Sequence, residues 1–226
     1  MPGSFASISV VVPTLDEEEG LAAALRSVRA GTEVIVVDGG SRDATRAVAE
    51  REGARVLEAA PGRGGQLDAG ARAASGDWIV FLHADTRLEE GWAEALRALP
   101  GPVVGGAFRL AIDSERPAFR LLERAVRVRV RLLGLPYGDQ GLFVRREVYG
   151  RIGGVPHLPL MEDVAFVSRL RRAGPLAFLP VRAFTSPRRW DRHGVLGTTL
   201  RNWWTMALYL AGHPPERLAR RYHGRG

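Results

Sequence analysis

The segment ISVVVPTLDEE, residues 8–18, contains the first indication of the fold. Ile8 to Val12 is an apolar run rich in β-branched residues, which is typical of a strand buried on both faces of a sheet. Pro13 ends the run, and the acidic residues that follow suit the first turn of a helix, because they complement its dipole. We therefore expect a strand followed directly by a helix that runs to Val28.

The same strand-then-helix unit is repeated until residue 85. Apolar runs predict further strands at 34–37, 55–57 and 78–82, and periodic patterns predict helices at 16–28, 43–52 and 65–74. Alternating strands and helices joined by short loops are typical of a parallel sheet covered on both faces. The expected fold class is therefore α/β, with a mostly parallel sheet.

Beyond residue 85 the alternation is less regular. The sequence predicts helices at 90–99, 117–133, 162–172 and 195–210, and strands at 103–112, 141–145 and 176–179. We expect a break in the first of these strands at Gly105-Gly106. The alternation from Val126 to Arg131 also fits a strand, but a helix is the favoured interpretation. That helix would gather arginines on one face, namely Arg120, Arg124, Arg127 and Arg131, and apolar residues on the other, namely Leu121, Leu122, Ala125 and Val128.

The composition excludes several classes of site. All 32 basic residues are arginine, so neither a P-loop lysine nor a Schiff-base lysine is available. The absence of cysteine excludes disulfides and thiolate metal sites. The net charge of +7 favours phosphate-rich partners or an anionic membrane surface, although a coding bias toward arginine is the simpler explanation.

Polar and acidic residues follow three of the predicted strands. The strand ends are Pro13-Thr14-Leu15-Asp16-Glu17, Asp38-Gly39-Gly40 and His83-Ala84-Asp85. Because ligands of such sheets bind at the carboxyl ends of the strands, these residues are candidates for a common site. Two of them also have a structural explanation, Asp38 as a helix cap and Asp85 as a turn residue before Thr86. The acidic pair Glu162-Asp163 is a further candidate, which a helix start would also explain.

Taken in order, these segments resemble the family 2 glycosyltransferases, in a small soluble bacterial subgroup. The resemblance extends from Ile8 to about Tyr222. The segments that carry it are residues 11–18 (VVPTLDEE), 36–43 (VVDGGSRD), 62–64 (GRG), 68–70 (DAG), 82–85 (LHAD), 136–140 (PYGDQ), 161–163 (MED) and 186–190 (SPRRW). It implies a GT-A fold, a Rossmann-like sheet with extra C-terminal helices.

The resemblance also implies a role for particular residues. Donor-binding residues would be Pro13, Thr14, Glu17, Asp38, Gly39, Arg63, Asp68, His83, Arg188 and Arg189, with His193 as a further candidate beside the leaving diphosphate. Asp85 would hold a divalent cation, Mg²⁺ or Mn²⁺. Asp163 would be the catalytic base, with Glu162 beside it.

The resemblance implies one domain over residues 1–226 in three parts. These are a nucleotide-binding half, 1–99, an acceptor and catalytic half, 100–193, and C-terminal helices, 194–226. The expected activity is the inverting transfer of one sugar from a nucleotide-diphosphate sugar to an unknown acceptor hydroxyl. Polymer synthesis is not expected, because Ser186 stands where processive synthases have Gln and no membrane-spanning stretch is apparent.

Two other functions are also compatible with the sequence. A sugar-phosphate nucleotidyltransferase would share the fold and the metal carboxylate, but it normally has a glycine-rich loop after the first strand. A non-catalytic nucleotide-binding or polyanion-binding protein would explain the charge but not the positions of Asp85 and Asp163.

The expected location is cytoplasmic, since no signal peptide is apparent. The arginine stripe and the aromatic helix around Trp203 could face a membrane or a lipid-linked acceptor, or Trp203, Trp204 and Tyr209 could form a core or a homodimer contact. A nucleic-acid partner is not expected.

Overall fold

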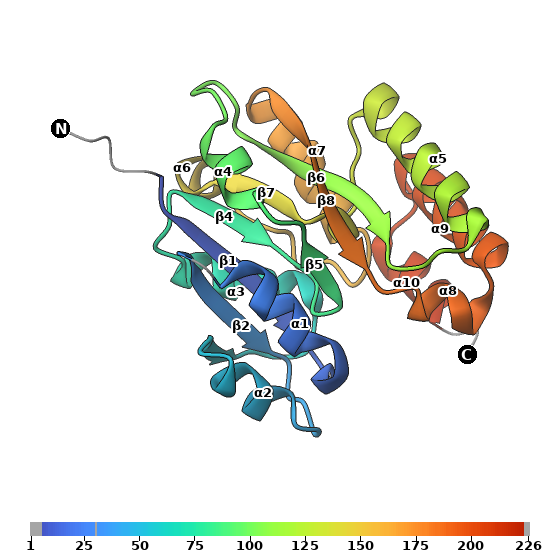
Figure 1. Cartoon of the computed structure of the whole chain (residues 1–226). Coiled ribbons are helices and arrows are strands. Elements are labelled where there is room, and N and C mark those ends of the chain that lie inside the picture. The colour runs from blue at the N-terminus through green and yellow to red at the C-terminus, as the bar shows by residue number, and fades with distance from the viewer. Residues whose placement is uncertain (1–5, 30, 224–226) are drawn as a thin grey trace.

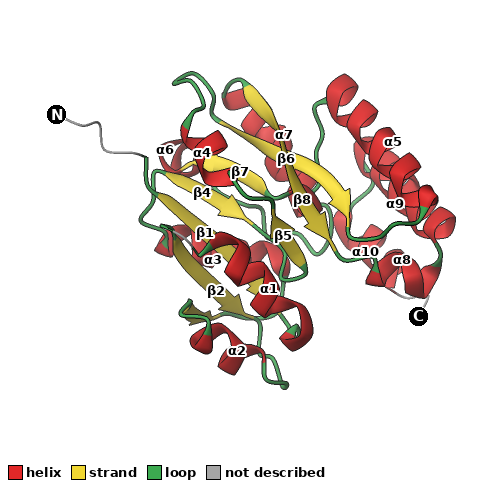
Figure 2. Cartoon of the chain, viewed as in Figure 1, coloured by secondary structure: helices red, strands yellow, loops and turns green. Residues whose placement is uncertain are grey.

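The computed structural model describes residues 6–29 and 31–223 (Figure 1). A single eight-stranded sheet has the strand order β3-β2-β1-β4-β7-β6-β8-β5, and helices lie on both of its faces (Figure 2). The predicted α/β fold class is confirmed.

The first half of the sheet is parallel, as predicted. Its strands are β1 (Ile8–Thr14), β2 (Glu33–Asp38), β3 (Arg55–Glu58) and β4 (Trp78–Phe81). β1 lies between β2 and β4 and is parallel to both. The register pairs Thr14 with Asp38, so the carboxyl ends of β1 and β2 meet at one edge, where the predicted site residues follow.

The second half of the sheet is mixed. Its strands are β5 (Thr86–Leu88), β6 (Gly105–Ile112), β7 (Leu142–Arg145) and β8 (Leu176–Thr185). β7 is antiparallel to both β4 and β6, whereas β6 and β8 are parallel. β5 is antiparallel to β8 and brings the segment after Asp85 to the far edge of the sheet.

Two apolar layers enclose the sheet. The first layer is formed by α1 (Glu18–Val28), α2 (Thr45–Arg51) and α4 (Trp92–Arg97). The second is formed by α3 (Arg63–Ala73), α6 (Arg146–Arg151) and α7 (Glu162–Ala173). Val10 and Val12 face the first layer and Val11 faces the second, which is the alternation expected of a strand buried on both sides.

Glycine allows α3 to lie close to the sheet. A Cβ on Gly70 would come within 2.3 Å of Cγ1 of Val11 and 2.9 Å of Cγ2 of Val37. Because core side chains are already close-packed, no larger residue fits there without moving the helix. This packing places the first residue of α3, Arg63, beside the carboxyl edge of the sheet.

A separate group of helices lies at one end of the molecule. It comprises α5 (Pro117–Leu133), α8 (Arg188–His193), α9 (Val195–Leu210) and α10 (Pro215–His223) (Figure 1). Phe119 of α5 contacts Trp190 of α8 with ring centroids 5.9 Å apart, and Val195 of α9 packs against the same cluster. The extra C-terminal helices of the prediction are therefore present.

Several details of the prediction are wrong. β1 continues through Pro13 to Thr14, and β8 extends to Thr185 rather than ending at residue 179. Gly105-Gly106 does not break a strand, because both residues are paired within β6. A Cβ on Gly106 would lie 1.8 Å from the carbonyl oxygen of Ala177, so the glycine permits close contact with β8. On α5, Leu121 and Val128 are exposed beside the arginines, and the buried face is formed by Phe119, Leu122, Val126 and Val130.

Several short elements were not predicted from the sequence. They are β5, α6, α8, α10 and the 3-10 turn η1 (Gly138–Gln140). Within residues 6–29 and 31–223, every helix is too short or too polar to cross a bilayer.

Candidate functional site

The loops after β1 and β2 are joined to each other by backbone and side-chain hydrogen bonds. The Asp16 N–H donates to the Ser41 hydroxyl at 3.0 Å, and the Arg42 N–H donates to the Asp16 carboxylate at 2.8 Å. The Glu17 N–H donates to the Thr45 hydroxyl at 2.8 Å. These bonds fix the orientation of Glu17 at the edge of the sheet.

Asp38 is at the predicted strand end but is fully buried. Its carboxylate accepts from the Gly40 and Ser41 N–H groups at 3.0 Å each, from the Arg46 Nε–H at 2.8 Å and from the Ser41 hydroxyl. Burial alone would raise the pKa of Asp38, but these donors outweigh it and lower the pKa to about 2. The side chain therefore shapes the loop after β2.

Gln66 ties together the ends of β1 and β2. Its amide nitrogen donates to the carbonyl oxygens of Thr14 and Val37, both at 2.8 Å. A Cβ on Gly39 would lie 3.1 Å from that nitrogen, so Gly39 leaves room for this bond. The Thr14 hydroxyl points toward Asp38 at 3.3 Å, whereas Pro13 remains partly exposed.

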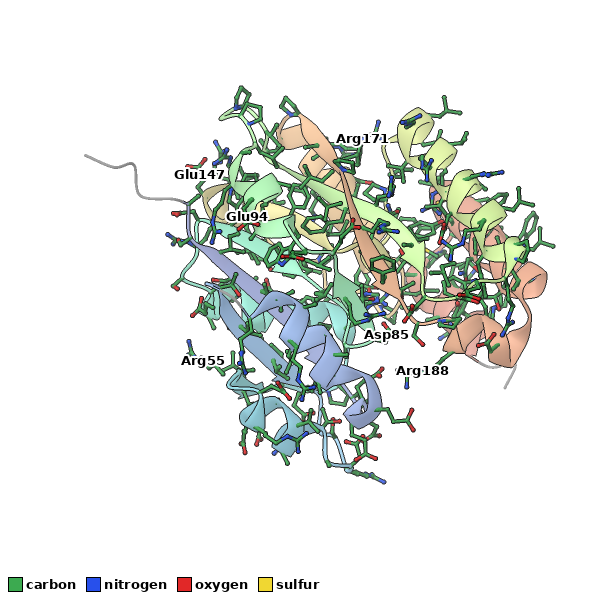
Figure 3. All side chains as sticks on the ribbon, in the orientation of Figure 1. Arg55, Asp85, Glu94, Glu147, Arg171 and Arg188 are labelled. Atoms are coloured by element: carbon green, nitrogen blue, oxygen red, sulfur yellow. The ribbon has the colours of Figure 1, made fainter. Side chains whose placement is uncertain are left out.

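Glu17, Asp85 and Arg188 come together from three different elements. Arg188 donates to Glu17 at 3.1 Å and to Glu19 at 3.2 Å, and it borders a pocket of about 250 Å³ that Asp85 also lines. Figure 3 labels Asp85 and Arg188 on the same side of the molecule. Burial and the charge of Asp85 raise the pKa of Glu17, and Arg188 opposes the rise.

A second carboxylate pair stands at the start of α7. Glu162 is almost completely buried and forms an ion pair with Arg63, the first residue of α3. Burial and the neighbouring Asp163 charge raise the pKa of Glu162, while Arg63 lowers it. Removing Arg63 would leave a buried carboxylate without its cation, which is costly. The pair therefore joins α3 to α7 across the edge of the sheet.

Asp163 lies more open to solvent than Glu162. Its two oxygens accept from the N–H groups of Gly138 and Val164, both at 2.8 Å. A Cβ on Gly138 would lie 2.9 Å from Nε2 of His83 and 3.5 Å from Oδ2 of Asp163. His83, after β4, and Asp163, at the start of α7, therefore converge on the same glycine.

Both non-glycine residues with positive φ among the described residues lie in the predicted motifs. Asp16 has φ 54° and Met161 has φ 65°. Non-glycine residues adopt this conformation at a cost, and such strain is concentrated at functional sites. Met161 directly precedes Glu162 and Asp163, and its conformation sets the direction in which α7 begins.

The pocket in front of Asp163 has a wall that was not predicted. The pocket has a volume of about 80 Å³, and the predicted residues Arg63, His83 and Asp163 form part of its lining. The lining residues for which no role was predicted are Tyr137, Leu160, Met161, Asn202 and Tyr222. The Tyr137 hydroxyl contacts the sulfur of Met206 at 2.7 Å, and burial raises the Tyr137 pKa to about 12. The motifs PYGDQ and MED were the local sequence signals for Tyr137 and Met161 in this wall.

Asp68 is not brought into this pocket. It accepts from the Tyr149 hydroxyl at 2.6 Å and from Arg72 at 2.9 Å, and it lies 3.2 Å from Nε2 of His157. Burial would raise the pKa of Asp68, but these partners lower it. The network joins α3 to α6 and the following loop. The side chains of Arg189 and His193, also predicted at the site, lie outside the described part of the structure.

The carboxylates at the edge of the sheet can contribute ligands to a cation but do not form a complete site. Among the described residues, no three His, Asp or Glu side chains form a group that could hold a metal by themselves. Asp85 does provide a carboxylate near Glu17, whose pKa is raised by burial and further by the charge of Asp85. Mg²⁺ is typically bound by one or two carboxylates together with substrate phosphates, so the residues present fit an ion shared with a diphosphate.

A family model described as glycosyl transferase family 2 matches residues 9–132, more than half of the chain. The chain belongs to this family. An uncharacterized glycosyltransferase of Mycobacterium tuberculosis is 41% identical over 86 residues, which cover 38% of this chain and 39% of the relative. The match thus spans about two-fifths of the length of that relative.

Solved structures of glycosyltransferases have the same fold. One is glucosyl-3-phosphoglycerate synthase from M. tuberculosis in complex with Mn²⁺, UDP-glucose and phosphoglyceric acid, at 25% identity and a TM-score of 0.55, covering 78% of this chain and 70% of that one. Another is a mannosyltransferase from Pyrobaculum calidifontis in complex with GDP-mannose and Mn²⁺, at 22% identity and a TM-score of 0.60, covering 81% and 57%. The predicted GT-A fold is confirmed.

Proposed function

We propose that this protein is an inverting glycosyltransferase that moves one sugar from a nucleotide-diphosphate sugar to an acceptor hydroxyl. The observation that supports this most strongly is the convergence of His83 and Asp163 on Gly138 at the mouth of one pocket. A strand-end residue that faces the donor and a carboxylate that faces the acceptor are thereby within reach of one sugar ring.

In this proposal the nucleoside lies over the carboxyl ends of β1 and β2. Pro13 and Glu17 face it directly, because Pro13 is partly exposed and Glu17 is held at the edge of the sheet. Asp38 and Gly39 act indirectly, since the buried Asp38 carboxylate organises the loop that forms the floor. We propose the same indirect part for Thr14, whose hydroxyl points toward Asp38.

The diphosphate lies between Asp85 and the basic residues near it. Asp85 would hold a divalent ion, which when bound would neutralise charge on the diphosphate. Arg188 is already positioned near Asp85 by Glu17 and Glu19, and it can exchange these carboxylates for a phosphate. Arg63 lines the pocket on the other side, where its guanidinium is held by Glu162.

Asp163 acts as the base. The acceptor oxygen forms a bond to the anomeric carbon while the bond from that carbon to the diphosphate oxygen breaks, and the diphosphate leaves with the electron pair. The acceptor proton passes to an oxygen of Asp163. The N–H groups of Gly138 and Val164 hold this carboxylate in place and leave each oxygen a further lone pair. Glu162 orients Arg63 and does not take the proton, because it is buried.

Three parts of the chain would divide this work. Residues 1–99 would bind the nucleotide, residues 100–193 would supply the base and the acceptor side, and residues 194–226 would cover the pocket. The lining of the pocket by Asn202 and Tyr222 supports the last assignment. The two solved neighbours were crystallised with UDP-glucose or GDP-mannose and Mn²⁺, which supports the donor class and the ion.

A ligand screen followed by product analysis tests the proposal. Thermal unfolding is measured with a series of nucleotide sugars, each with and without Mn²⁺. A donor at a hundredfold excess over its Kd should stabilise the protein by about 2.7 kcal/mol. Stabilising donors are then assayed for slow hydrolysis.

The products separate the candidate functions. Release of nucleoside diphosphate supports a glycosyltransferase. Formation of a nucleotide sugar and pyrophosphate from sugar phosphate and nucleoside triphosphate would show a nucleotidyltransferase. Binding without turnover of any donor, with or without acceptors, would show a binding protein. Either of the last two results would contradict the proposal.

A further inference from the structure

Exposed large apolar side chains are concentrated on two helices. On α5 they are Leu121, Val128, Leu132 and Leu133, and on α9 they are Leu200, Trp203, Trp204 and Leu210. Trp204 is 61% exposed and Leu132 is 77% exposed. The two helices meet where Val195, at the start of α9, packs against the buried face of α5. Large exposed apolar groups gathered on helices of one group mark an interaction surface rather than ordinary surface scatter. We call these eight residues the α5–α9 surface.

The solvent side of α5 has two parallel rows. At 3.6 residues per turn, Leu121, Val128 and Leu132 form one row and the arginines form the row beside it, namely Arg120, Arg124, Arg127 and Arg131. The only acidic residue of α5, Glu123, is buried and paired with Arg120. An apolar row beside a basic row is the arrangement of a helix that lies in a membrane interface.

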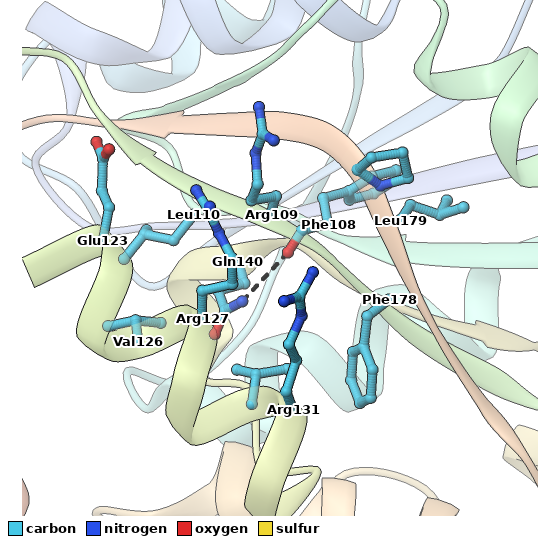
Figure 4. A pocket seen from close by; sticks show the side chains of 12 residues that line it. Phe108, Arg109, Leu110, Glu123, Val126, Arg127, Arg131, Gln140, Phe178 and Leu179 are labelled. Atoms are coloured by element: carbon cyan, nitrogen blue, oxygen red, sulfur yellow. Dashed lines mark hydrogen bonds between the residues drawn. The ribbon is translucent and has the colours of Figure 1, made fainter. Parts of the chain in front are cut away.

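The basic row continues into a pocket between α5 and the sheet. This pocket has a volume of about 170 Å³, and Arg109, Arg127 and Arg131 line it around Gln140 (Figure 4). Gln140 is held by a hydrogen bond from its amide to the Phe108 carbonyl oxygen at 3.2 Å. Phe178, which is 41% exposed, also lines the pocket. Glu123 also lines the pocket, and its charge is balanced by Arg120 at 2.7 Å. The three arginines therefore leave positive charge that suits a phosphate group flanked by apolar chain.

The aromatic helix α9 links this surface to the candidate active site. It contains no acidic residue, and its exposed Trp203 and Trp204 directly follow Asn202, which lines the pocket of Asp163. Tryptophan is favoured at membrane interfaces, because its ring is apolar and its N–H remains polar. One helix therefore borders the site and also presents apolar side chains to solvent.

We propose that the α5–α9 surface docks this protein onto a membrane that contains anionic lipids, so that the acceptor is reached from the membrane side. Charge complementarity selects this partner. A second copy would bring two arginine rows together, and like charges repel, whereas anionic headgroups attract each arginine. The delivery of the acceptor rests on the proposed function, but the docking itself does not.

Vesicle flotation tests the docking. The full chain is mixed with vesicles of phosphatidylcholine alone or of phosphatidylcholine with phosphatidylglycerol. It should float with the mixed vesicles only, and binding should weaken as salt is raised, because surface charges are screened. Brominated lipid in the mixed vesicles should quench the tryptophan fluorescence.

Paired variants locate the surface. Arg124→Gln with Arg131→Gln should weaken binding to mixed vesicles by about 25-fold, at about fivefold for each arginine. Trp203→Ser with Trp204→Ser should weaken it on the order of tenfold or more. Matched controls away from the surface are Arg51→Gln on α2 and Leu15→Ser, both at exposed positions. Neither control variant should change the binding of the protein to the mixed vesicles.

Three results would overturn the proposal: no flotation with the mixed vesicles, equal binding by the paired variants and the controls, or a dimer in sedimentation whose interface protects Trp204 from quenching. Binding of nucleotide sugar is measured on the same variants without vesicles. Retained donor binding with lost flotation supports docking alone, so failure of the proposed function would be seen separately.

Discussion

The carboxylate at the end of β2, Asp38, and two carboxylates of the candidate site, the half-buried Glu17 and the buried Glu162, have pKa values that move in opposite directions. The pKa of Asp38 is lowered to about 2 by hydrogen-bond donors that outweigh its burial. The pKa values of Glu17 and Glu162 are raised by burial and by a neighbouring negative charge, Asp85 or Asp163, although each has an arginine partner. The two regions therefore use the same chemical group in different ways.

The direction of the pKa shift distinguishes carboxylates that stabilise the fold from carboxylates that are available to a ligand. A carboxylate surrounded by N–H and O–H donors stabilises the fold and has few sites left for a ligand, and Asp38 is of this kind. Two carboxylates placed close together are held against repulsion, which costs free energy, and such arrangements are concentrated at functional sites. The pairs Glu17–Asp85 and Glu162–Asp163 are of the second kind.

The largest effect is expected from Asp163→Asn. The amide can still accept the hydrogen bond from Gly138 but cannot take a proton, so turnover should fall by about 10²- to 10⁴-fold. Donor affinity should stay near that of the wild type. Single-turnover transfer and calorimetric titration of the donor measure the two quantities.

A matched variant sharpens this result. Glu147→Gln changes an acidic residue in the first turn of α6, outside the pockets, and should leave turnover unchanged. If the Asp163→Asn protein transfers sugar at nearly the wild-type rate, Asp163 is only part of the helix start and the base lies elsewhere.

Local patterns were sufficient to predict the parallel half of the sheet. The β-branched runs at β1 and β2 and the glycines after the helices are signals within a few residues of each element. Short elements gave no such signal. β5 has three residues and exists because it pairs with β8, almost a hundred positions later in the sequence. The two glycines of β6 looked like a break because the sequence does not show the neighbouring Ala177 carbonyl.

The candidate site, like the fold, was predictable only where local sequence motifs indicate it. The resemblance assigned His83, Asp85 and Asp163 to one site. The structure places His83 and Asp163 at one pocket and Asp85 with Arg188 at another, so their common role stays a prediction. Two partners of Asp68 could not be predicted, because Tyr149 and His157 are more than eighty positions away. Asn202 and Tyr222 reach the pocket through the packing of α9 and α10, which no local pattern describes.

A smaller effect, on stability, is expected from Asp38→Asn. The folded pKa of about 2 lies below the ordinary value of 3.8, so ionised Asp38 contributes about 2 kcal/mol to the free energy of unfolding at neutral pH. This contribution is present above pH 4 and is lost as the pH falls through the folded pKa. Urea unfolding at several pH values should show this acid-dependent loss in the wild type and not in the variant.

The neighbouring helix offers a control for that experiment. Glu50 is exposed on α2, so Glu50→Gln should preserve both the stability and its pH dependence. If the free energy of unfolding changes with pH equally in the wild type and in Asp38→Asn, ionised Asp38 does not stabilise the fold.

The smallest effect is expected at the Glu17–Asp85 pair. Burial and Asp85 raise the folded pKa of Glu17, so its contribution to stability is full below its ordinary pKa of 4.5 and declines as the pH rises through the folded pKa. Asp85→Asn removes the repulsion, and this decline should become smaller. In the wild type, Mn²⁺ with uridine diphosphate at tenfold excess over its Kd should add about 1.4 kcal/mol, and the variant should lose the part that depends on Mn²⁺.

Asp113 provides the control, because it lines the same pocket as Asp85 but has Arg87 as its partner at 2.6 Å. Asp113→Asn should keep the full Mn²⁺ effect in thermal unfolding, measured with and without the nucleotide. If Asp85→Asn and Asp113→Asn respond to Mn²⁺ alike, the ion is not held at Asp85. The raised pKa of Glu17 would then be a consequence of its burial in the fold. The opposite pKa shifts of Glu17 and Asp38 would no longer distinguish residues of the candidate site from residues that stabilise the fold.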